Sequence, residues 1–98
     1  MYKVLIVEDD PMVAMINEQY VLKHGKFKVV GKCQDGEKAI EFLAKNEADL
    51  VVMDVFMPKT DGFETLRRLR RDGKTIEAIM VTAASAPVLD SIVLPPKP

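Results

Sequence analysis

Three carboxylates follow two apolar segments of the chain. Asp9 and Asp10 close the segment KVLIVEDD, and Asp54 closes the segment LVVMD. Short apolar runs of this kind are typical of strands that are buried on both faces of a parallel sheet. If the two strands are neighbours, the carboxylates meet at the carboxyl edge of the sheet, which is where ligands bind in open α/β sheets.

Carboxylates that meet in this way repel one another unless protons or a cation compensate their charge. Hard oxygen ligands favour Mg²⁺, Ca²⁺ or Mn²⁺ over zinc, and Mg²⁺ takes a few protein oxygens, keeps waters and bridges to phosphate. The three acids therefore predict a Mg²⁺ site, with Mn²⁺ as the alternative ion. Spacing alone leaves a second interpretation open, in which Asp9 and Asp10 only cap a helix beside a turn.

Two later residues could complete a site for a phosphoryl group. Thr82 ends the predicted strand AIMV, and Lys97 follows the short apolar run IVL. With a metal on one side and a hydroxyl and an ammonium on the other, the Asp54 carboxylate would be a nucleophile that forms an acyl phosphate. The metal and the lysine would neutralise charge on the transferred group. Thr82 is equally consistent with an ordinary β-branched strand residue.

The elements that must position these residues alternate along the chain. Strands are predicted at residues 3–7, 27–33, 50–54 and 78–81. Between each pair of strands a helix is expected to begin after an aspartate that suits the N-cap position. These aspartates are Asp10, Asp35 and Asp61. The alternation predicts an α/β fold, with a doubly wound parallel sheet and helices on both of its faces.

The helical spacing of apolar residues predicts which side of each helix meets the sheet. The expected buried residues are Val13, Ile16, Tyr20 and Val21 in the first helix, Ala39, Ile40, Leu43 and Ala44 in the second, and Phe63, Leu66 and Leu69 in the third. Glu64 stands three residues after Asp61, which predicts a variant of the capping box. The single cysteine, Cys33, is expected to be a small buried hydrophobe.

The pattern breaks after residue 82. The last 16 residues carry prolines at positions 87, 95, 96 and 98, and a strand at residues 92–94 would leave nine residues for the crossover. A βαβ connection needs about 10 to 12 residues including its helix. We therefore expect the fourth helix, fifth strand and fifth helix to be shortened or missing. Residues 1–98 are expected to form one domain, with a typical part at 1–84 and an atypical tail at 85–98.

Charge and composition argue against several classes of protein. The 98 residues include 14 basic and 15 acidic side chains, and this net charge of −1 does not suit a nucleic-acid surface. No apolar run approaches the roughly 18 residues that would span a bilayer. One cysteine fits a reducing compartment. We expect a cytoplasmic domain without membrane contact or direct nucleic-acid binding.

The sequence resembles the receiver domain of two-component response regulators over residues 2–84. The resemblance is carried by the acidic pair after KVLIVE, by DVFMPKTDG at residues 54–62 and by the VTAA run from Val81. It implies a flavodoxin-like sheet with the strand order 2-1-3-4-5. Within this family, the sequence looks most similar to the citrate- and malate-sensing branch, whose members usually carry a C-terminal helix-turn-helix domain.

The resemblance also implies roles for individual residues. Asp54 would accept a phosphoryl group from a sensor histidine kinase. Asp9, Asp10 and Asp54 would hold Mg²⁺, and the backbone carbonyl of Phe56 would be a further ligand. The domain would act as a signalling switch that takes part in its own phosphorylation rather than as a conventional enzyme.

The remaining implied roles concern the response to phosphorylation. Thr82 would move toward the phosphoryl group, and the backbone amide of Ala83 would contact it. The change would pass to a transcriptional output domain outside this chain. Lys97 matches the family's lysine by type only, because Pro95 and Pro96 precede it where a strand is expected.

Three other functions are compatible with such a fold, and the residues argue against two of them. A Mg²⁺-dependent phosphatase of the haloacid-dehalogenase type would need a second acid where Phe56 stands, and a flavodoxin-like nucleotide binder would need a phosphate loop where residues 8–12 are acidic and lack glycine. The third is an interaction module that is not phosphorylated. In that case an uncovered fourth strand would favour a homodimer through the edge of the sheet.

Overall fold

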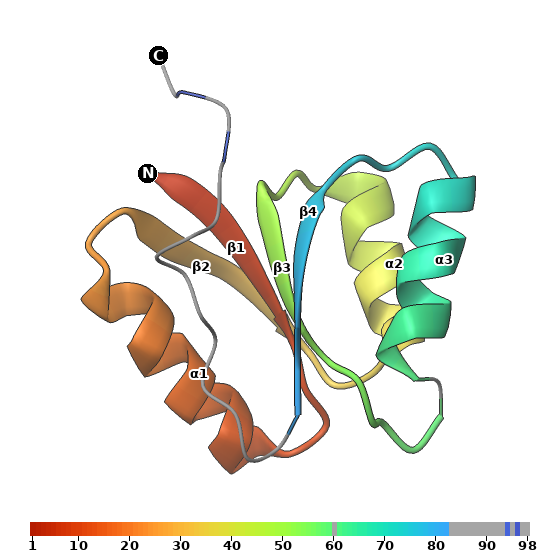
Figure 1. The fold of residues 1–98 in the computed structure, drawn as a ribbon, viewed down its shortest axis with the longest axis horizontal. Coiled ribbons are helices and arrows are strands. Elements are labelled where there is room, and N and C mark those ends of the chain that lie inside the picture. The colour runs from red at the N-terminus through yellow and green to blue at the C-terminus, as the bar shows by residue number, and fades with distance from the viewer. Residues whose placement is uncertain (60, 83–93, 95, 97–98) are drawn as a thin grey trace.

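Four parallel strands form one sheet in the order β2-β1-β3-β4. The computed structural model describes residues 1–59, 61–82, 94 and 96. Its elements are β1 (Tyr2–Val7), α1 (Pro11–Lys23), β2 (Phe27–Cys33), α2 (Gly36–Lys45), β3 (Leu50–Asp54), α3 (Gly62–Arg71) and β4 (Glu77–Val81). Helix α1 covers one face of the sheet, and α2 and α3 cover the other (Figure 1).

The predicted doubly wound α/β fold is confirmed, and so is the predicted order for its first four strands. The expectations for the fourth helix and for residues 92 and 93 of the fifth strand lie outside the described residues. Leu94 is described, lies outside helices and strands, and packs against the core on the α1 side. The division into residues 1–84 and 85–98 stays a prediction.

The central strands β1 and β3 carry most of the core. The last four residues of β1 and all five of β3 are buried. On the α1 side the core consists of Val4, Ile6, Ala14, Val21, Phe27, Leu50, Val52 and Val81. On the other side it consists of Leu5, Val7, Cys33, Ala39, Leu43, Val51, Met53, Met57 and Leu69, so the expected burial of Cys33 is confirmed. Each large aliphatic side chain buried here stabilises the fold by about 1.5–3 kcal/mol.

All three helices begin at the aspartates that the sequence predicts. The Oδ1 atoms of Asp10, Asp35 and Asp61 accept hydrogen bonds from backbone N–H groups at 2.9, 2.9 and 2.7 Å. Glu64 provides the N–H that Asp61 accepts, but its own carboxylate pairs with Arg67. Only one of the two hydrogen bonds of a capping box is therefore present. The N-cap side chain accepts its hydrogen bond, whereas the glutamate side chain pairs with a neighbouring arginine.

The sheet-facing side of α1 differs from the predicted one. The buried residues of this helix are Ala14, Asn17 and Val21, whereas Ile16 and Tyr20 are 44% and 45% exposed. The prediction for Val21 is confirmed, and the predictions for Ile16 and Tyr20 are wrong. Apolar residues lie all round α1, so their spacing does not define one face, and a small side chain and an amide fill the contact with the sheet.

The other two helices show smaller departures. In α2, Ala39 and Leu43 are buried as expected, but Ala44 is exposed. In α3, Leu69 is buried as expected, but Phe63 is 55% exposed. The residues that share the buried side of α3 with Leu69 are Gly62 and Thr65. Small side chains let this helix lie close to the sheet, and an apolar pattern does not reveal them.

Gly62 brings the start of α3 into contact with the end of β3. A Cβ atom at this position would lie 2.4 Å from the Asp54 carbonyl oxygen and 2.6 Å from Met80 Cε. Its N–H donates to the Val55 carbonyl at 2.8 Å. Only glycine leaves enough space for this approach, so Gly62 helps to define the position of Asp54.

We predict that Gly62→Ala lowers the free energy of unfolding by about 3 kcal/mol, because the new methyl group meets a backbone carbonyl that cannot move aside alone. Urea denaturation measures this loss. Gly73→Ala is the control, since a Cβ there meets no atom within 4 Å and only the φ of 84° is unfavourable, which costs about 1–2 kcal/mol. Equal losses for the two variants would contradict the close approach.

No helix among the described residues has the length and apolar character needed to cross a membrane.

Candidate functional site

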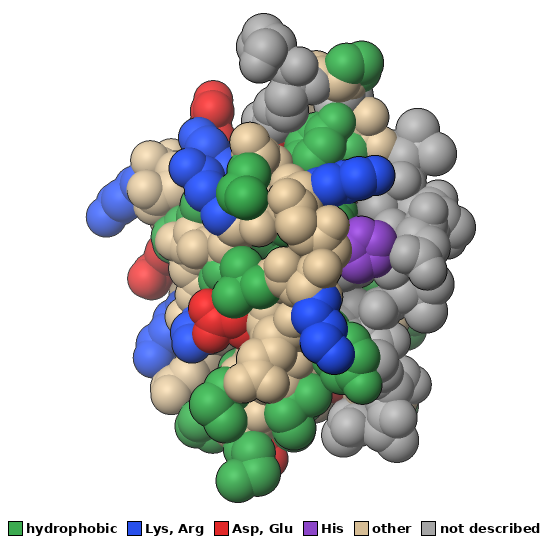
Figure 2. Space-filling model, turned by 90° about the vertical axis from the view of Figure 1, so that its left-hand side faces the viewer, with side chains coloured by type: hydrophobic (Ala, Val, Ile, Leu, Met, Phe, Trp, Pro, Cys, Tyr) green, Lys and Arg blue, Asp and Glu red, His purple; other side chains and the backbone are tan. Residues whose placement is uncertain are grey.

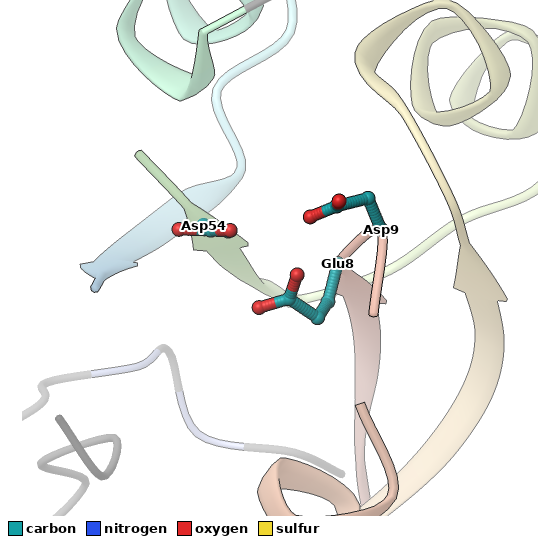
Figure 3. A group of neighbouring side chains, drawn as sticks. All are labelled: Glu8, Asp9 and Asp54. Carbon is teal, nitrogen blue, oxygen red and sulfur yellow. The ribbon is translucent and has the colours of Figure 1, made fainter. Parts of the chain in front are cut away.

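Three carboxylates share one spot at the carboxyl edge of the sheet. Glu8 and Asp9 follow β1, and Asp54 ends β3. Each offers an oxygen, and these oxygens all lie within 4.8 Å of one another. Figure 3 shows the carboxyl groups of Glu8 and Asp9 both directed to the side on which Asp54 lies. The acid group, as we call Glu8, Asp9 and Asp54, thus joins two neighbouring strand ends.

The strand register explains why these residues meet. In the parallel pairing of β1 with β3, Val7 lies opposite Met53, so Glu8 and Asp54 are the next residues on the two strands. The Glu8 N–H donates to the Cys33 carbonyl at 2.9 Å, which continues the pairing with β2. The two residues therefore lie side by side at the carboxyl edge of the sheet, and each is only 4% exposed.

Burial makes the Glu8 carboxylate costly to ionise. It raises the pKa of Glu8 to about 7, and the side chains of Asp9 and Asp54 raise it too, while the backbone N–H of Asp10 lowers it. That N–H donates to Glu8 Oε2 at 3.1 Å. The other oxygen, Oε1, is buried without a hydrogen-bond partner among the described residues.

The acid group fits a hard divalent cation. Its ligands are all oxygens, which suits Mg²⁺ or Mn²⁺ better than zinc. A cation would compensate the mutual repulsion of the three carboxylates and would give the buried Oε1 of Glu8 a partner. Since the group comprises only three side chains, it leaves room for waters and for an oxygen of a bound phosphate, as Mg²⁺ prefers.

The backbone after β3 holds the Asp54 side chain in place. Asp54 Oδ1 accepts a hydrogen bond from the Phe56 N–H at 3.1 Å. The Val55 N–H donates to the Val81 carbonyl at 2.8 Å, so the segment stays attached to β4. The Phe56 side chain is 73% exposed. The role of the Phe56 carbonyl as a metal ligand stays a prediction.

The structure brings Asp9 and Asp54 together as expected, but it adds Glu8 and leaves Asp10 outside the acid group. Asp10 is exposed, and its Oδ1 accepts from the Met12 N–H as the N-cap of α1. The helix-cap alternative therefore describes the geometry of Asp10, whose role as a metal ligand remains untested. Glu8 could have been found from the sequence, because it directly follows the last apolar residue of its strand, as Asp54 does.

The other predicted site residues come from the end of β4. Val81 lies opposite Asp54 in the pairing of β3 with β4, and Thr82 follows it as an exposed residue. Thr82 is therefore close in the fold to the acid group, and its predicted role stays a prediction. Ala83 and Lys97 lie outside the described residues.

Comparison with known proteins finds one family. The model of the response regulator receiver domain matches residues 4–93. The transcriptional regulatory protein CitT of Halalkalibacterium halodurans is 42% identical over 86 residues, which cover 86% of this chain and 37% of CitT. The protein-glutamate methylesterase/protein-glutamine glutaminase 1 of Syntrophus aciditrophicus is 40% identical over 84 residues, which cover 86% of this chain and 24% of that protein. The chain thus spans well under half the length of these relatives.

Among solved structures, the response regulator MaeR bound to beryllium trifluoride is similar with a TM-score of 0.79 and 36% identity. The similarity covers 87% of this chain and 70% of that chain. The resemblance to receiver domains that the sequence motifs indicate is confirmed by these matches.

We predict that Mg²⁺ stabilises the folded protein, by about 2.7 kcal/mol at 100 times its Kd, and that Glu8→Gln removes most of this gain because a charged ligand is lost. Thermal unfolding with and without Mg²⁺ measures the effect. Asp10→Asn is the matched control, since asparagine caps a helix as well as aspartate. A loss in Asp10→Asn with an intact gain in Glu8→Gln would assign the ligand role to Asp10 instead.

Proposed function

This chain belongs to the response regulator receiver domain family, and we propose that it is a signalling switch that accepts a phosphoryl group on Asp54. The observation that carries the proposal is the position of the Asp54 carboxylate, which ends a fully buried strand beside Glu8 and Asp9. A buried, hydrogen-bonded carboxylate next to a cation site is a suitable nucleophile for phosphorus.

The reaction needs little from the protein beyond position and charge. An oxygen of the Asp54 carboxylate attacks the phosphorus, and an acyl phosphate forms as the bond from phosphorus to the donor breaks. With a phosphohistidine donor, the electron pair of the broken P–N bond returns to the imidazole. The Phe56 N–H keeps Asp54 Oδ1 oriented. Mg²⁺, or Mn²⁺, held by Glu8, Asp9 and Asp54 with the Phe56 carbonyl, would supply charge neutralisation on the phosphoryl oxygens.

The proposed donor is a sensor histidine kinase, and the surface of α1 supports a protein partner. Five large apolar residues of this helix are between 44% and 66% exposed. They are Met12, Met15, Ile16, Tyr20 and Leu22. Figure 2 shows the side of the molecule on which α1 lies, with hydrophobic side chains gathered toward its lower end. Since α1 begins at Asp10, this surface adjoins the acid group, and a docked donor could reach Asp54.

The output of the switch is proposed to lie in a separate domain. The relative CitT is a transcriptional regulatory protein of which this chain matches 37%. A transcriptional output domain is the counterpart that we propose for this receiver, with Thr82 and the Ala83 amide as the residues that respond to the phosphoryl group. The methylesterase relative shows that a similar receiver can also accompany an enzyme, and our proposal assigns no catalysis to the receiver beyond its own phosphorylation.

We predict that acetyl phosphate and Mg²⁺ add one phosphoryl group to the protein and that Asp54→Asn abolishes the addition, because an amide oxygen is a poor nucleophile for phosphorus. Intact-mass spectrometry detects the adduct. Asp72→Asn, an exposed aspartate at the end of α3, is the control and should be labelled normally. A wild-type protein without an adduct would contradict the proposed function and favour an interaction module.

A second prediction concerns the α1 surface. The double variant Met15→Ser and Ile16→Ser should accept phosphate from a phosphorylated histidine kinase at least 10-fold more slowly, because apolar contact area with the donor is lost. Labelling by acetyl phosphate, which is too small to need contact with α1, should not change. Phe63→Ser alters a similarly exposed side chain on the opposite face of the sheet and serves as the control. Equal slowing with both donors would contradict docking at α1.

A further inference from the structure

A pocket of about 290 Å³ opens beside the acid group. Its lining residues are Asp9, Gln34, Asp35, Lys38, Pro58 and Lys59. Three separate parts of the chain build it, namely the end of β1, the start of α2 and the loop after β3. Asp9 belongs both to the pocket and to the acid group, so a molecule in the pocket lies next to the site of phosphorylation.

The pocket contains both positive and negative side chains, whereas the acid group contains only carboxylates. Its lining contains two positively charged side chains, Lys38 and Lys59, and two negatively charged ones, Asp9 and Asp35. The Lys59 Nζ lies 3.8 Å from Asp35 Oδ2, while Asp35 Oδ1 accepts the Lys38 N–H as the N-cap of α2. Without the two lysines, the pocket would add its negative charges to those of Glu8 and Asp54, and an anion would be repelled from both.

The lysines are placed to act on an incoming ligand more than to stabilise the fold. The Lys59 side chain is 75% exposed, and exposed ion pairs of this kind contribute about 0–1 kcal/mol to stability. Lys38 is also exposed. An exposed charge beside a concave site attracts ligands of the opposite charge and raises their rate of association.

Resting on the proposed function, we infer that Lys38 and Lys59 make this receiver selective for doubly charged small phosphodonors, that is, acyl phosphates, over singly charged ones. The two lysines neutralise the mouth of the site and draw the dianion toward Asp54. They are specificity-determining residues, and the transfer itself stays with Asp54.

The transfer from an acyl phosphate balances without a further reactant. The Asp54 carboxylate forms a bond to phosphorus, the bond from phosphorus to the acyl oxygen breaks, and the carboxylate product leaves with the electron pair. No proton has to move, because nucleophile and leaving group are both anions. Acetyl phosphate carries two negative charges near neutral pH, whereas phosphoramidate carries one net charge, so the attraction to each lysine is about twice as large for acetyl phosphate.

The experiment compares initial rates of Asp54 phosphorylation by these two donors in the wild type and in the double variant Lys38→Gln and Lys59→Gln. We expect the rate with acetyl phosphate to fall on the order of 5-fold and the rate with phosphoramidate on the order of 2-fold. Added KCl should reduce the wild-type advantage with acetyl phosphate, since 0.15 M salt screens charges beyond about 8 Å. Intact-mass spectrometry follows both reactions.

Three controls make the result specific. Lys45→Gln changes a lysine in the last turn of α2, away from the pocket, and should leave both rates unchanged. The double variant Lys38→Arg and Lys59→Arg keeps the charges and should retain the wild-type preference. Thermal unfolding should show that all variants remain folded.

The possible failures can be told apart. Equal slowing with both donors, or no slowing with either, would overturn the inference while leaving phosphorylation of Asp54 intact. An absent adduct on the wild type with both donors would overturn the proposed function and the inference together.

Discussion

The repulsion among three carboxylates at the end of the β1 and β3 pair is the constraint on which the rest of the site depends. Glu8 and Asp54 are almost wholly buried, and their oxygens lie with that of Asp9 within 4.8 Å. Such a group does not stabilise the folded domain, because burial of charge costs free energy. The apolar core of the two central strands offsets this cost, and a cation bound by the group would reduce it.

The fold was largely predictable from the sequence, because strand runs, helix caps and their alternation are local signals. Asp10, Asp35 and Asp61 cap their helices as predicted. The sides of the helices were harder to predict. Asn17 and Thr65 are buried against the sheet, and polar side chains in such positions give no hydrophobic period. These two side chains are buried because their size fits the space between helix and sheet, which only the tertiary structure defines.

The sequence predicted the chemistry of the candidate site better than it predicted which residues form the site. Asp54 was identified by its place after a buried strand, and Glu8 was missed although it stands at the corresponding place after β1. Asp9 and Asp10 are adjacent acidic residues in the sequence, but the register of the strands decides which carboxylates meet. The pocket with Lys38 and Lys59 could not be predicted, because it joins three parts of the chain that are far apart in the sequence, with Lys59 standing 50 positions after Asp9.

The acidic residues at the carboxyl edge of the sheet fall into two groups, those that cap a helix and those that do not. Every described helix begins at this edge, so the positive end of each helix dipole, equivalent to roughly half a unit charge, points toward it. Asp10, Asp35 and Asp61 each sit on such an end and have their charge offset locally. The carboxylates of Glu8, Asp9 and Asp54 lie at the ends of strands and cap none of these helices. Among the described residues of this edge, the negative charge that no helix dipole offsets is therefore concentrated on Glu8, Asp9 and Asp54, and a metal ion would be attracted to that place.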